Sequence, residues 1–373
     1  MKFAFCLFKY FPSGGLQRGF LQLAQVCASR GHQIDVYTGS WEGERPGNLD
    51  ISIIPHKGLT NHRRYQSMAD RLEKLFASRS YNVIAGFNKM PGLDIYFASD
   101  TCFAANARKR SLLYRLSGRC RTLMQLEESV FHKNSRTHII SISDNEKQRY
   151  MEYYNTPEHR FHSVPPGIAR DRGAGSDSVE IRKNLRQEFG ITPDQHLVLM
   201  VGSDYKRKGV DRTIKALSAL PSDLKEKTRL FVIGKGKPGP LIRLSRQKKV
   251  ASLVTFLGER GDVPRFLAGA DILLHPARQE NTGTVLIEAM AAGLPVLATE
   301  ICGYGFHIKQ AEAGELVPDP FIQENLNHKL IHMLRSDKRE KWKDNAKAYV
   351  RTTDVYSRHE KAADIIEAAA ALR

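Results

Sequence analysis

The sequence predicts an α/β protein with two Rossmann-like domains, each built on a parallel sheet. Short apolar runs alternate with amphipathic stretches of helical period, this alternation occurs twice, and Pro165, Pro166 and Gly167 separate the two series. Buried strands joined through helices are typical of parallel sheets that are covered on both faces. A length of 373 residues suits two domains of ordinary size.

The first series starts with an apolar run at residues 3–8, which ends shortly before Pro12 and the Gly14-Gly15 pair. An amphipathic helix is expected at 16–30, because Gly31 stops the pattern and a strand resumes after it. Further strands of this domain are expected at 34–37, 51–54, 83–87, 95–98 and 139–142. The first domain is therefore expected to span residues 1–165.

The second series repeats the pattern over residues 166–356. Its strands are expected at 197–201, 230–233, 254–257, 272–274 and 296–298, with helices at 210–220 and 285–292 among them. At the C-terminus, Ser357 and Glu360 have the spacing of a capping box, which opens an Ala-rich helix that reaches Leu372. The apolar positions of this helix, at 357–373, predict that it docks on a domain.

The charge of the chain is unusual, with 57 Lys and Arg against 40 Asp and Glu, a net charge of +17. Such an excess favours an anionic partner: nucleic acid, an anionic membrane or a phosphorylated small molecule. No apolar run approaches the roughly 20 residues of a membrane-spanning helix. Five scattered cysteines without a C-x-x-C pair are typical of reduced thiols in a cytoplasmic protein.

A basic segment at residues 103–126 supplies much of the excess charge in the first domain. It holds six cations and no acidic residue, namely Arg108, Lys109, Arg110, Arg115, Arg119 and Arg121. Drawn as one helix, it places Leu112, Leu116, Cys120 and Leu123 in an apolar stripe flanked by these cations. Such a stripe is typical of an interfacial helix on anionic lipid. The alternative is a core helix with a solvated face.

In each expected domain, one loop that contains glycine follows the first strand. Gly14-Gly15 precedes a helix, where glycine lets backbone N–H groups approach a ligand closely, although a plain tight turn explains it too. Arg207 and Lys208 lie between a strand and the helix at 210. Cations at a helix start are unfavourable unless an anion lies between them and the helix, so we expect a phosphate clamp. A solvated charge cluster is the alternative.

Glu280 and Glu288 flank a second expected helix start at residues 282–284. The free N–H groups around Gly283 and Thr284 can hold a diphosphate, and a carboxylate beside them can accept hydrogen bonds from sugar hydroxyls. The other interpretation is an N-terminal preference for acidic residues plus one surface Glu.

A metal site and a dinucleotide site are both disfavoured. The stretch 234–239 matches G-x-G-x-x-G, but Pro238 is unusual there and no acidic residue lies about 20 positions further on. The chain has no D-x-D and no His/Cys cluster with zinc spacing. Bound phosphates are then expected to be neutralised by Lys, Arg and helix ends, with no metal and no other cofactor.

Taken together, the Gly-Gly loop, the Arg-Lys pair and the Glu-x7-Glu pair resemble family 4 of the retaining glycosyltransferases. Within that family, residues 5–12, 14–18, 40–43 and 86–94 resemble the glucosyltransferases of bacterial lipopolysaccharide core assembly. The resemblance implies the GT-B fold: two Rossmann-like domains facing a central cleft, with the C-terminal helix crossing back to the first domain. It covers essentially the whole chain.

The resemblance also implies an activity: retaining transfer of glucose from UDP-glucose to an inner-core heptose of lipopolysaccharide. The first domain, with helix 357–373, would bind the acceptor, and 166–356 would bind the nucleotide sugar. The enzyme would work at the cytoplasmic face of the inner membrane, as a peripheral protein on its anionic surface.

Family roles carry over to individual positions. Gly15 would back the diphosphate, Arg207 and Lys208 would neutralise it, Glu280 would hold glucose hydroxyls and Glu288 the ribose. The remaining expected donor contacts are Arg172, Arg260, Thr282, Gly283 and Thr284. Asp100, after the strand at 95–98, is the candidate that faces the acceptor, so the expected catalytic set is Glu280, Asp100, Arg207 and Lys208.

Other functions remain open alternatives. A transferase of another sugar, or a nucleotide-sugar epimerase on the same fold, would share the donor site. A nucleic-acid-binding protein would explain the charge of +17, but no stripe interleaves aromatic and basic residues as such proteins require. Nucleic acid is therefore not expected as a partner.

Overall fold

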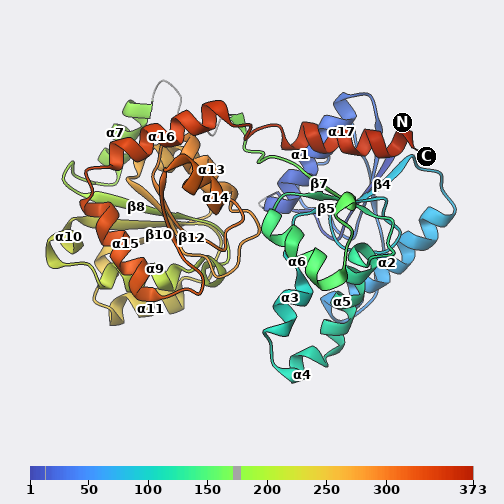
Figure 1. Ribbon diagram of the computed structural model, residues 1–373, viewed down its shortest axis with the longest axis horizontal. Coiled ribbons are helices and arrows are strands. Elements are labelled where there is room, and N and C mark those ends of the chain that lie inside the picture. Colours follow the sequence, from blue (N-terminus) through green and yellow to red (C-terminus); the bar gives the residue numbers. More distant parts are fainter. Residues whose placement is uncertain (13, 171–177, 373) are drawn as a thin grey trace. The chain divides into compact units, whose positions relative to one another are not determined.

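The computed structural model describes residues 1–12, 14–170 and 178–372. It divides into two compact units, one formed by Met1–Pro165 with Ser357–Arg373 and the other by Pro166–Tyr356. Each unit has a parallel sheet with helices on both faces (Figure 1). The two-sheet α/β architecture predicted from the alternation is confirmed.

The first unit contains a seven-stranded sheet in the order β3-β2-β1-β4-β5-β6-β7. The strands are β1 Lys2–Leu7, β2 Gln33–Thr38, β3 Asp50–Ile53, β4 Val83–Gly86, β5 Ile95–Ala98, β6 His138–Ser141 and β7 Phe161–Ser163. Phe3 of β1 lies opposite Ile34 of β2 and Val83 of β4. The strand order therefore reverses between β1 and β4, where ligands bind in open sheets of this kind.

Both faces of this sheet are buried, which explains the continuous apolar run at its start. Phe3, Phe5 and Leu7 pack in one core, and Ala4 and Cys6 pack in the other. The helices are α1 Gly15–Ser29, α2 Asn61–Ala77, α3 Phe103–Arg108, α4 Leu112–Arg115, α5 Gly118–Phe131, α6 Asp144–Tyr154 and α17 Arg358–Ala371, with a 3-10 turn η1 Glu158–Arg160.

The C-terminal helix α17 docks beside α1 of the first unit (Figure 1). Arg30, next to the end of α1, contacts Asp364 at 2.8 Å and Glu367 at 3.0 Å. Ala362 and Ile366 are buried in the core of that sheet face. The docking is thus as expected, but the capping box is not formed, since the Ser357 side chain makes no capping hydrogen bond.

The second unit contains a six-stranded sheet in the order β10-β9-β8-β11-β12-β13. The strands are β8 His196–Val201, β9 Thr228–Ile233, β10 Val254–Gly258, β11 Ile272–His275, β12 Val296–Thr299 and β13 Gly314–Val317. The strand order reverses between β8 and β11. The helices are α7 Ser178–Glu188, α8 Tyr205–Lys208, α9 Val210–Ser218, α10 Ser222–Lys227, α11 Gly239–Gln247, α12 Val263–Gly269, α13 Thr284–Ala291, α14 Gly305–Ala311, α15 Gln323–Arg335 and α16 Arg339–Thr352, with η3 Ala251–Leu253.

The basic segment is not the single helix that was expected, because it forms the three helices α3, α4 and α5. The side chains of Ser111 and Ser117 accept hydrogen bonds from Tyr114 N and Cys120 N, so each serine starts a new helix. The apolar stripe is broken too, since Cys120 is buried while Leu112 and Leu116 are exposed.

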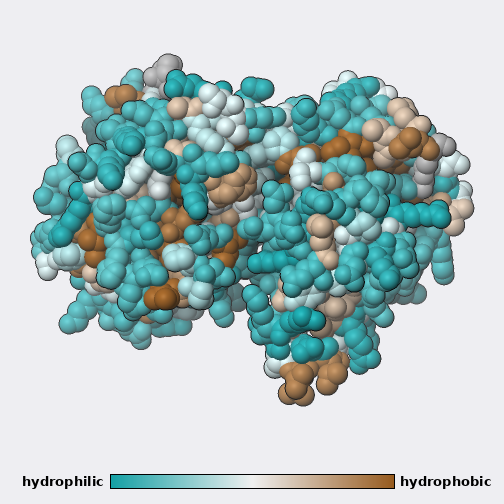
Figure 2. Space-filling model, viewed as in Figure 1, coloured by the Kyte–Doolittle hydropathy of each residue, from teal (hydrophilic) through white to brown (hydrophobic). Residues whose placement is uncertain are grey.

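The short helix α4 carries an exposed apolar tip instead. Leu112, Leu113 and Leu116 are 71%, 83% and 69% exposed, and Figure 2 shows hydrophobic surface gathered where α4 lies in Figure 1. All six cations of the segment are exposed around it. No helix within the described residues is long and apolar enough to span a membrane.

Candidate functional site

The site in the second unit lies at the carboxyl ends of β8 and β11, where the strand order reverses. The helices α8 and α9 follow β8, and the loop 276–283 follows β11. Gly209, between α8 and α9, has φ 78°, and a Cβ there would lie 2.1 Å from the Pro276 carbonyl oxygen. Glycine therefore allows the two loops to touch, and Arg278 N donates to Arg207 O at 2.8 Å.

This contact brings the Arg-Lys pair to Glu280. The Lys208 ammonium forms an ion pair with Glu280 Oε2, and Arg207 Nη1 lies 3.6 Å from the same oxygen. His275, the last residue of β11, places Nε2 at 3.3 Å from it. All these contacts converge on Oε2, so Oε1 of Glu280 has no hydrogen-bond or ionic partner within the described part of the chain.

The electrostatics of this cluster keep Glu280 ionised. Burial alone would raise the pKa of its carboxyl, but the His275 hydrogen bond and the charges of Lys208 and Arg207 hold that pKa well below its ordinary value. Burial, reinforced by Lys208, lowers the pKa of His275. Its imidazole is thus neutral at pH 7 and donates Nε2–H to the carboxylate.

Helix α13 begins directly after this carboxylate. Gly283 caps it with φ 83°, and a Cβ on Gly283 would lie 3.4 Å from Glu280 Cγ. Thr282 O accepts from Tyr304 N at 2.8 Å, which anchors the loop. The N–H groups of Thr284 and Val285, at the start of α13, have no intrahelical acceptor and carry the positive end of the helix dipole. Glu288 follows in the second turn, half-buried.

Arg260, which was expected as a donor contact, does not lie in this cluster. Its guanidinium binds Asp262 with two hydrogen bonds of 2.7 and 2.8 Å and lies over the Phe266 ring. It follows β10, which is separated from β8 by β9. The stretch 234–239 is a turn whose Gly234 approaches Gly202 closely. Arg172 lies outside the described residues.

Two expected site residues belong to the first unit. Gly15 is the first residue of α1, and a Cβ there would meet no atom within 4 Å, so packing gives no reason for glycine. Asp100 follows β5 and is half-buried. Burial raises the pKa of its carboxyl, although the charge of Lys89 opposes that shift. Its carboxylate makes no hydrogen bond or ion pair to another described residue.

His275 was missed by the sequence analysis, although a polar residue that ends an apolar strand just before Pro276 was an available signal. Among the described residues, no group of three or more His, Cys, Asp or Glu side chains is arranged to hold a metal ion. All five cysteines are buried free thiols.

Comparisons with known proteins cover almost the whole chain. Residues 181–349 match the family described as glycosyl transferases group 1, and residues 13–172 match glycosyltransferase family 4. The chain is 44% identical to lipopolysaccharide glucosyltransferase WaaG of Escherichia coli K12 over 97% of this chain and 98% of that protein. The crystal structure of WaaG, a glycosyltransferase involved in lipopolysaccharide biosynthesis, superposes with a TM-score of 0.92 at 44% identity, over 98% of this chain and 99% of that one.

A more distant structure shares the fold alone. HepE of Anabaena, solved in complex with UDP and glucose, has a TM-score of 0.75 at 17% identity and covers 99% of this chain and 100% of its own.

Proposed function

The chain belongs to the family 4 glycosyltransferases, with the GT-B fold, and we propose that it transfers glucose from UDP-glucose to a heptose of the lipopolysaccharide inner core. The observation that supports binding of the donor is the ionised carboxylate of Glu280. Its Oε2 contacts two cations, its Oε1 has no partner within the described part of the chain, and it lies next to the start of α13. The 44% identity to the lipopolysaccharide glucosyltransferase supports the sugar and the acceptor. We assign donor binding to 166–356 and acceptor binding to 1–165 with 357–373.

In this proposal, the second unit holds UDP-glucose without a metal. Lys208 and Arg207 face the diphosphate together with the N–H groups at Gly283 and Thr284. Glu280 Oε1 accepts a hydrogen bond from a glucose hydroxyl, and Glu288 binds the ribose hydroxyls. Thr282 holds the loop before α13 in place, because its carbonyl oxygen accepts a hydrogen bond from Tyr304 N. Gly15, Arg172 and Arg260 remain predicted as further donor contacts. To bind the donor, the guanidinium of Arg260 has to exchange Asp262 for the ligand.

The proposed chemistry is transfer with retention of configuration. The bond between glucose C1 and the phosphate oxygen breaks, the acceptor hydroxyl bonds to C1 from the same face, and its proton passes to the departing UDP. Lys208 and Arg207 stabilise the charge that develops on the leaving diphosphate.

A transfer assay tests this function. The protein is incubated with a panel of UDP- and ADP-sugars and with core lipopolysaccharide that lacks the outer core. We expect glucose transfer from UDP-glucose that survives EDTA and falls at least about 100-fold in Glu280→Ala, the scale at which a transition-state contact is lost. Glu324→Ala, an exposed residue of α15, serves as the matched control and should retain activity.

Three results would overturn or correct the proposal. Full activity of Glu280→Ala would remove Glu280 from the donor site. Conversion of a UDP-sugar to its epimer in the absence of acceptor would favour the epimerase alternative, and transfer of a sugar other than glucose would correct the donor.

We also propose that the first unit binds the cytoplasmic face of the inner membrane through α4. Leu112 and Leu113 of α4 and Leu116 directly after it can enter the interface while the surrounding cations attract anionic lipid, each by about 1 kcal/mol. Replacement of Arg108, Arg110, Arg115 and Arg119 by Gln should release the protein from phosphatidylglycerol vesicles.

The control for this membrane test removes the same number of charges elsewhere. Arg243, Arg246, Lys248 and Lys249 are exposed cations of the second unit, and their replacement by Gln should leave vesicle binding intact. Equal binding by both quadruple variants would refute α4 as the membrane contact.

A further inference from the structure

His275 is the contact of Glu280 that comes from the sheet itself. It is the last residue of β11, its side chain is fully buried, and its Nε2 lies 3.3 Å from Glu280 Oε2. The other two residues that contact this oxygen, Arg207 and Lys208, lie in the short helix α8. The carboxylate is therefore held by one group on a buried strand and by two cations on a separate helix.

The imidazole of His275 has one ring nitrogen without a partner. Because a carboxylate only accepts hydrogen bonds, Nε2 carries the proton that faces Glu280, and Nδ1 keeps a lone pair. Nδ1 is buried and has no hydrogen-bond partner within the described residues. Such an atom lowers stability, whereas Leu273 and Leu274, which precede it on β11, are fully buried and apolar. Packing thus gives no reason for a histidine, and the contact from Nε2 to Glu280 does.

The three contacts of Glu280 Oε2 differ in how well they orient the carboxylate. The Lys208 ammonium is a compact charge on a flexible stem, and Arg207 Nη1, at 3.6 Å, is beyond hydrogen-bond distance. In the proposed function both cations also face the diphosphate, so they are shared between two anions when the donor binds. The imidazole N–H points in one direction, and its ring is fixed by the buried strand. His275 is therefore the group that can keep Oε2 in one place and Oε1 free for a ligand.

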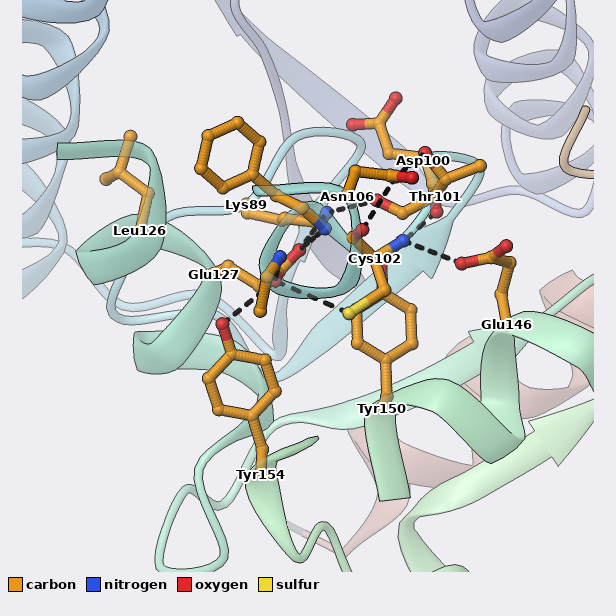
Figure 3. Close-up of polar contacts among 12 residues, drawn as sticks. Lys89, Asp100, Thr101, Cys102, Asn106, Leu126, Glu127, Glu146, Tyr150 and Tyr154 are labelled. Carbon is orange, nitrogen blue, oxygen red and sulfur yellow. Dashed lines mark hydrogen bonds and ion pairs between the residues drawn. The ribbon is translucent and has the colours of Figure 1, made fainter. Parts of the chain in front are cut away.

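Glu127 in the first unit shows a buried carboxylate that is held in a different way (Figure 3). Its Oε2 accepts from Lys89 Nζ at 2.5 Å and from Phe103 N at 2.7 Å, and its Oε1 accepts from Ala104 N at 2.8 Å. Tyr154 Oη adds a neutral donor to Oε1 at 2.8 Å. Since two backbone N–H groups orient this carboxylate, it stays in place without the tyrosine hydroxyl.

The side chain of Glu280 lacks that kind of support. Within the described part of the chain, its carboxylate accepts from no backbone N–H, and its hydrogen bonds come from the side chains of Lys208 and His275. Its orientation therefore depends on those side chains, of which His275 is the one that stays clear of the diphosphate.

We propose that His275 is a positioning residue for the donor sugar, whose Nε2–H holds Oε2 of Glu280 so that Oε1 accepts from a glucose hydroxyl while Lys208 and Arg207 serve the diphosphate. In this role His275 acts through Glu280 and does not touch the donor. The inference rests on the proposed transferase function and deepens it, because it names the group that orients the sugar-binding carboxylate. It predicts that loss of the Nε2–H weakens binding of UDP-glucose and leaves binding of UDP unchanged.

Two amide variants separate the Nε2–H from the rest of the side chain. Both amides carry N–H donors, but the nitrogen of His275→Gln reaches the place of Nε2, whereas that of His275→Asn reaches only the place of Nδ1. UDP-glucose and UDP are each titrated into the wild type and the two variants by calorimetry. His275→Asn should bind UDP-glucose about tenfold more weakly, as for a lost hydrogen bond to a charged group, and His275→Gln should stay within about threefold of the wild type. UDP affinity should stay within about twofold in both variants, because UDP carries no glucose.

Tyr154→Phe is the matched control, because it also removes a neutral donor from a buried glutamate. It should leave the affinities for UDP-glucose and for UDP within about twofold, since Glu127 belongs to the first unit and keeps its backbone donors. In the transfer assay, His275→Asn should raise the KM for UDP-glucose, and His275→Gln should restore it. Circular dichroism and the UDP affinity together show that each variant is folded.

The outcomes separate this inference from the proposed function. Wild-type affinity for UDP-glucose in His275→Asn, together with weakened affinity in Glu280→Gln, overturns the role of His275 and leaves the function standing. Equal losses for UDP-glucose and UDP, or equal losses in His275→Asn and His275→Gln, assign a structural role alone and overturn the inference. A wild type that transfers no glucose from UDP-glucose to core lipopolysaccharide overturns both. Weaker binding of UDP-glucose alone, in His275→Asn and not in His275→Gln, supports the proposal.

Discussion

Each unit of this glycosyltransferase has a buried glutamate paired with a lysine, yet the two pairs differ in what they leave free. Glu127, in the first unit, uses both carboxylate oxygens to accept from Lys89, two backbone N–H groups and Tyr154. Glu280, in the second unit, receives Lys208, Arg207 and His275 at Oε2 alone.

This difference separates a structural carboxylate from one that can bind a ligand. A buried charge is tolerated when it is paired and hydrogen-bonded, and Glu127 is fully satisfied by the protein itself. Glu280 has the charge compensation but keeps one oxygen open, so a bound hydroxyl can complete its hydrogen bonds. Burial and a lysine partner therefore do not by themselves identify a functional glutamate.

The largest effect that tests this contrast is on stability. Glu127→Gln removes one partner of a buried pair and leaves Lys89 uncompensated, which should lower the free energy of unfolding by about 3–5 kcal/mol. Glu280→Gln should lower it by less than half as much, because all contacts of Glu280 converge on Oε2 and the single amide oxygen of Gln can accept them in its place. Urea denaturation measures both, with exposed Glu128→Gln as the control. Equal losses at Glu127 and Glu280 would break the contrast.

A smaller effect on stability comes from His359, which is buried in its neutral form. Burial and then the charge of Arg358 lower the pKa of His359 in α17 to about 4. The unfolded chain binds a proton near pH 6.5, whereas the folded chain does not until about pH 4, so stability falls as the pH drops through that window. At pH 5 this amounts to roughly 2 kcal/mol.

Urea denaturation at pH 7 and pH 5 checks that value by comparing the wild type with His359→Gln. The variant should lose less stability on acidification by the same roughly 2 kcal/mol. Glu280 has the same sign in a more acidic window, because its lowered pKa keeps its contribution intact down to about pH 4.5 and stability is lost as the pH falls further. An unchanged pH dependence in His359→Gln would exclude this histidine as the source.

The smallest effect concerns Gly19, in the interior of α1. A Cβ there would lie 3.8 Å from His359 Nε2, an ordinary contact. Gly19→Ala should therefore stabilise the protein by about 0.5–1 kcal/mol through the higher helix propensity of alanine. Gly86→Ala is the contrasting variant, since its Cβ would meet Leu93 Cδ1 at 2.3 Å and should destabilise. Thermal unfolding distinguishes them, and a loss of stability in Gly19→Ala would contradict the prediction.

The fold was predictable because its strands are short apolar runs that need both sheet faces covered. The strands β7 and β13 were missed, since Phe161–Ser163 and Gly314–Val317 contain few consecutive apolar residues. The basic segment was predicted as one helix, and the mistake came from Ser111 and Ser117, whose local caps override the apolar period.

The candidate site was partly predictable from the chain alone. The Arg-Lys pair and Glu280 lie next to strand ends and helix starts, so their proximity follows from the sheet. Glu127 was not predictable in the same way, because its partner Lys89 lies 38 positions away and only the tertiary structure pairs them. A charged residue amid the buried positions Leu126 and Val130 was the available signal.

The claim that Glu280 Oε1 binds the donor sugar is tested most directly by calorimetry. UDP-glucose and UDP are each titrated into the wild type and into Glu280→Gln. If Oε1 holds a glucose hydroxyl, the variant should bind UDP-glucose at least about tenfold more weakly, as for a lost hydrogen bond to a charged group. Its affinity for UDP should stay within about twofold, because UDP carries no glucose. Equal weakening of both ligands, or of neither, would contradict the assignment of Glu280 to the donor sugar.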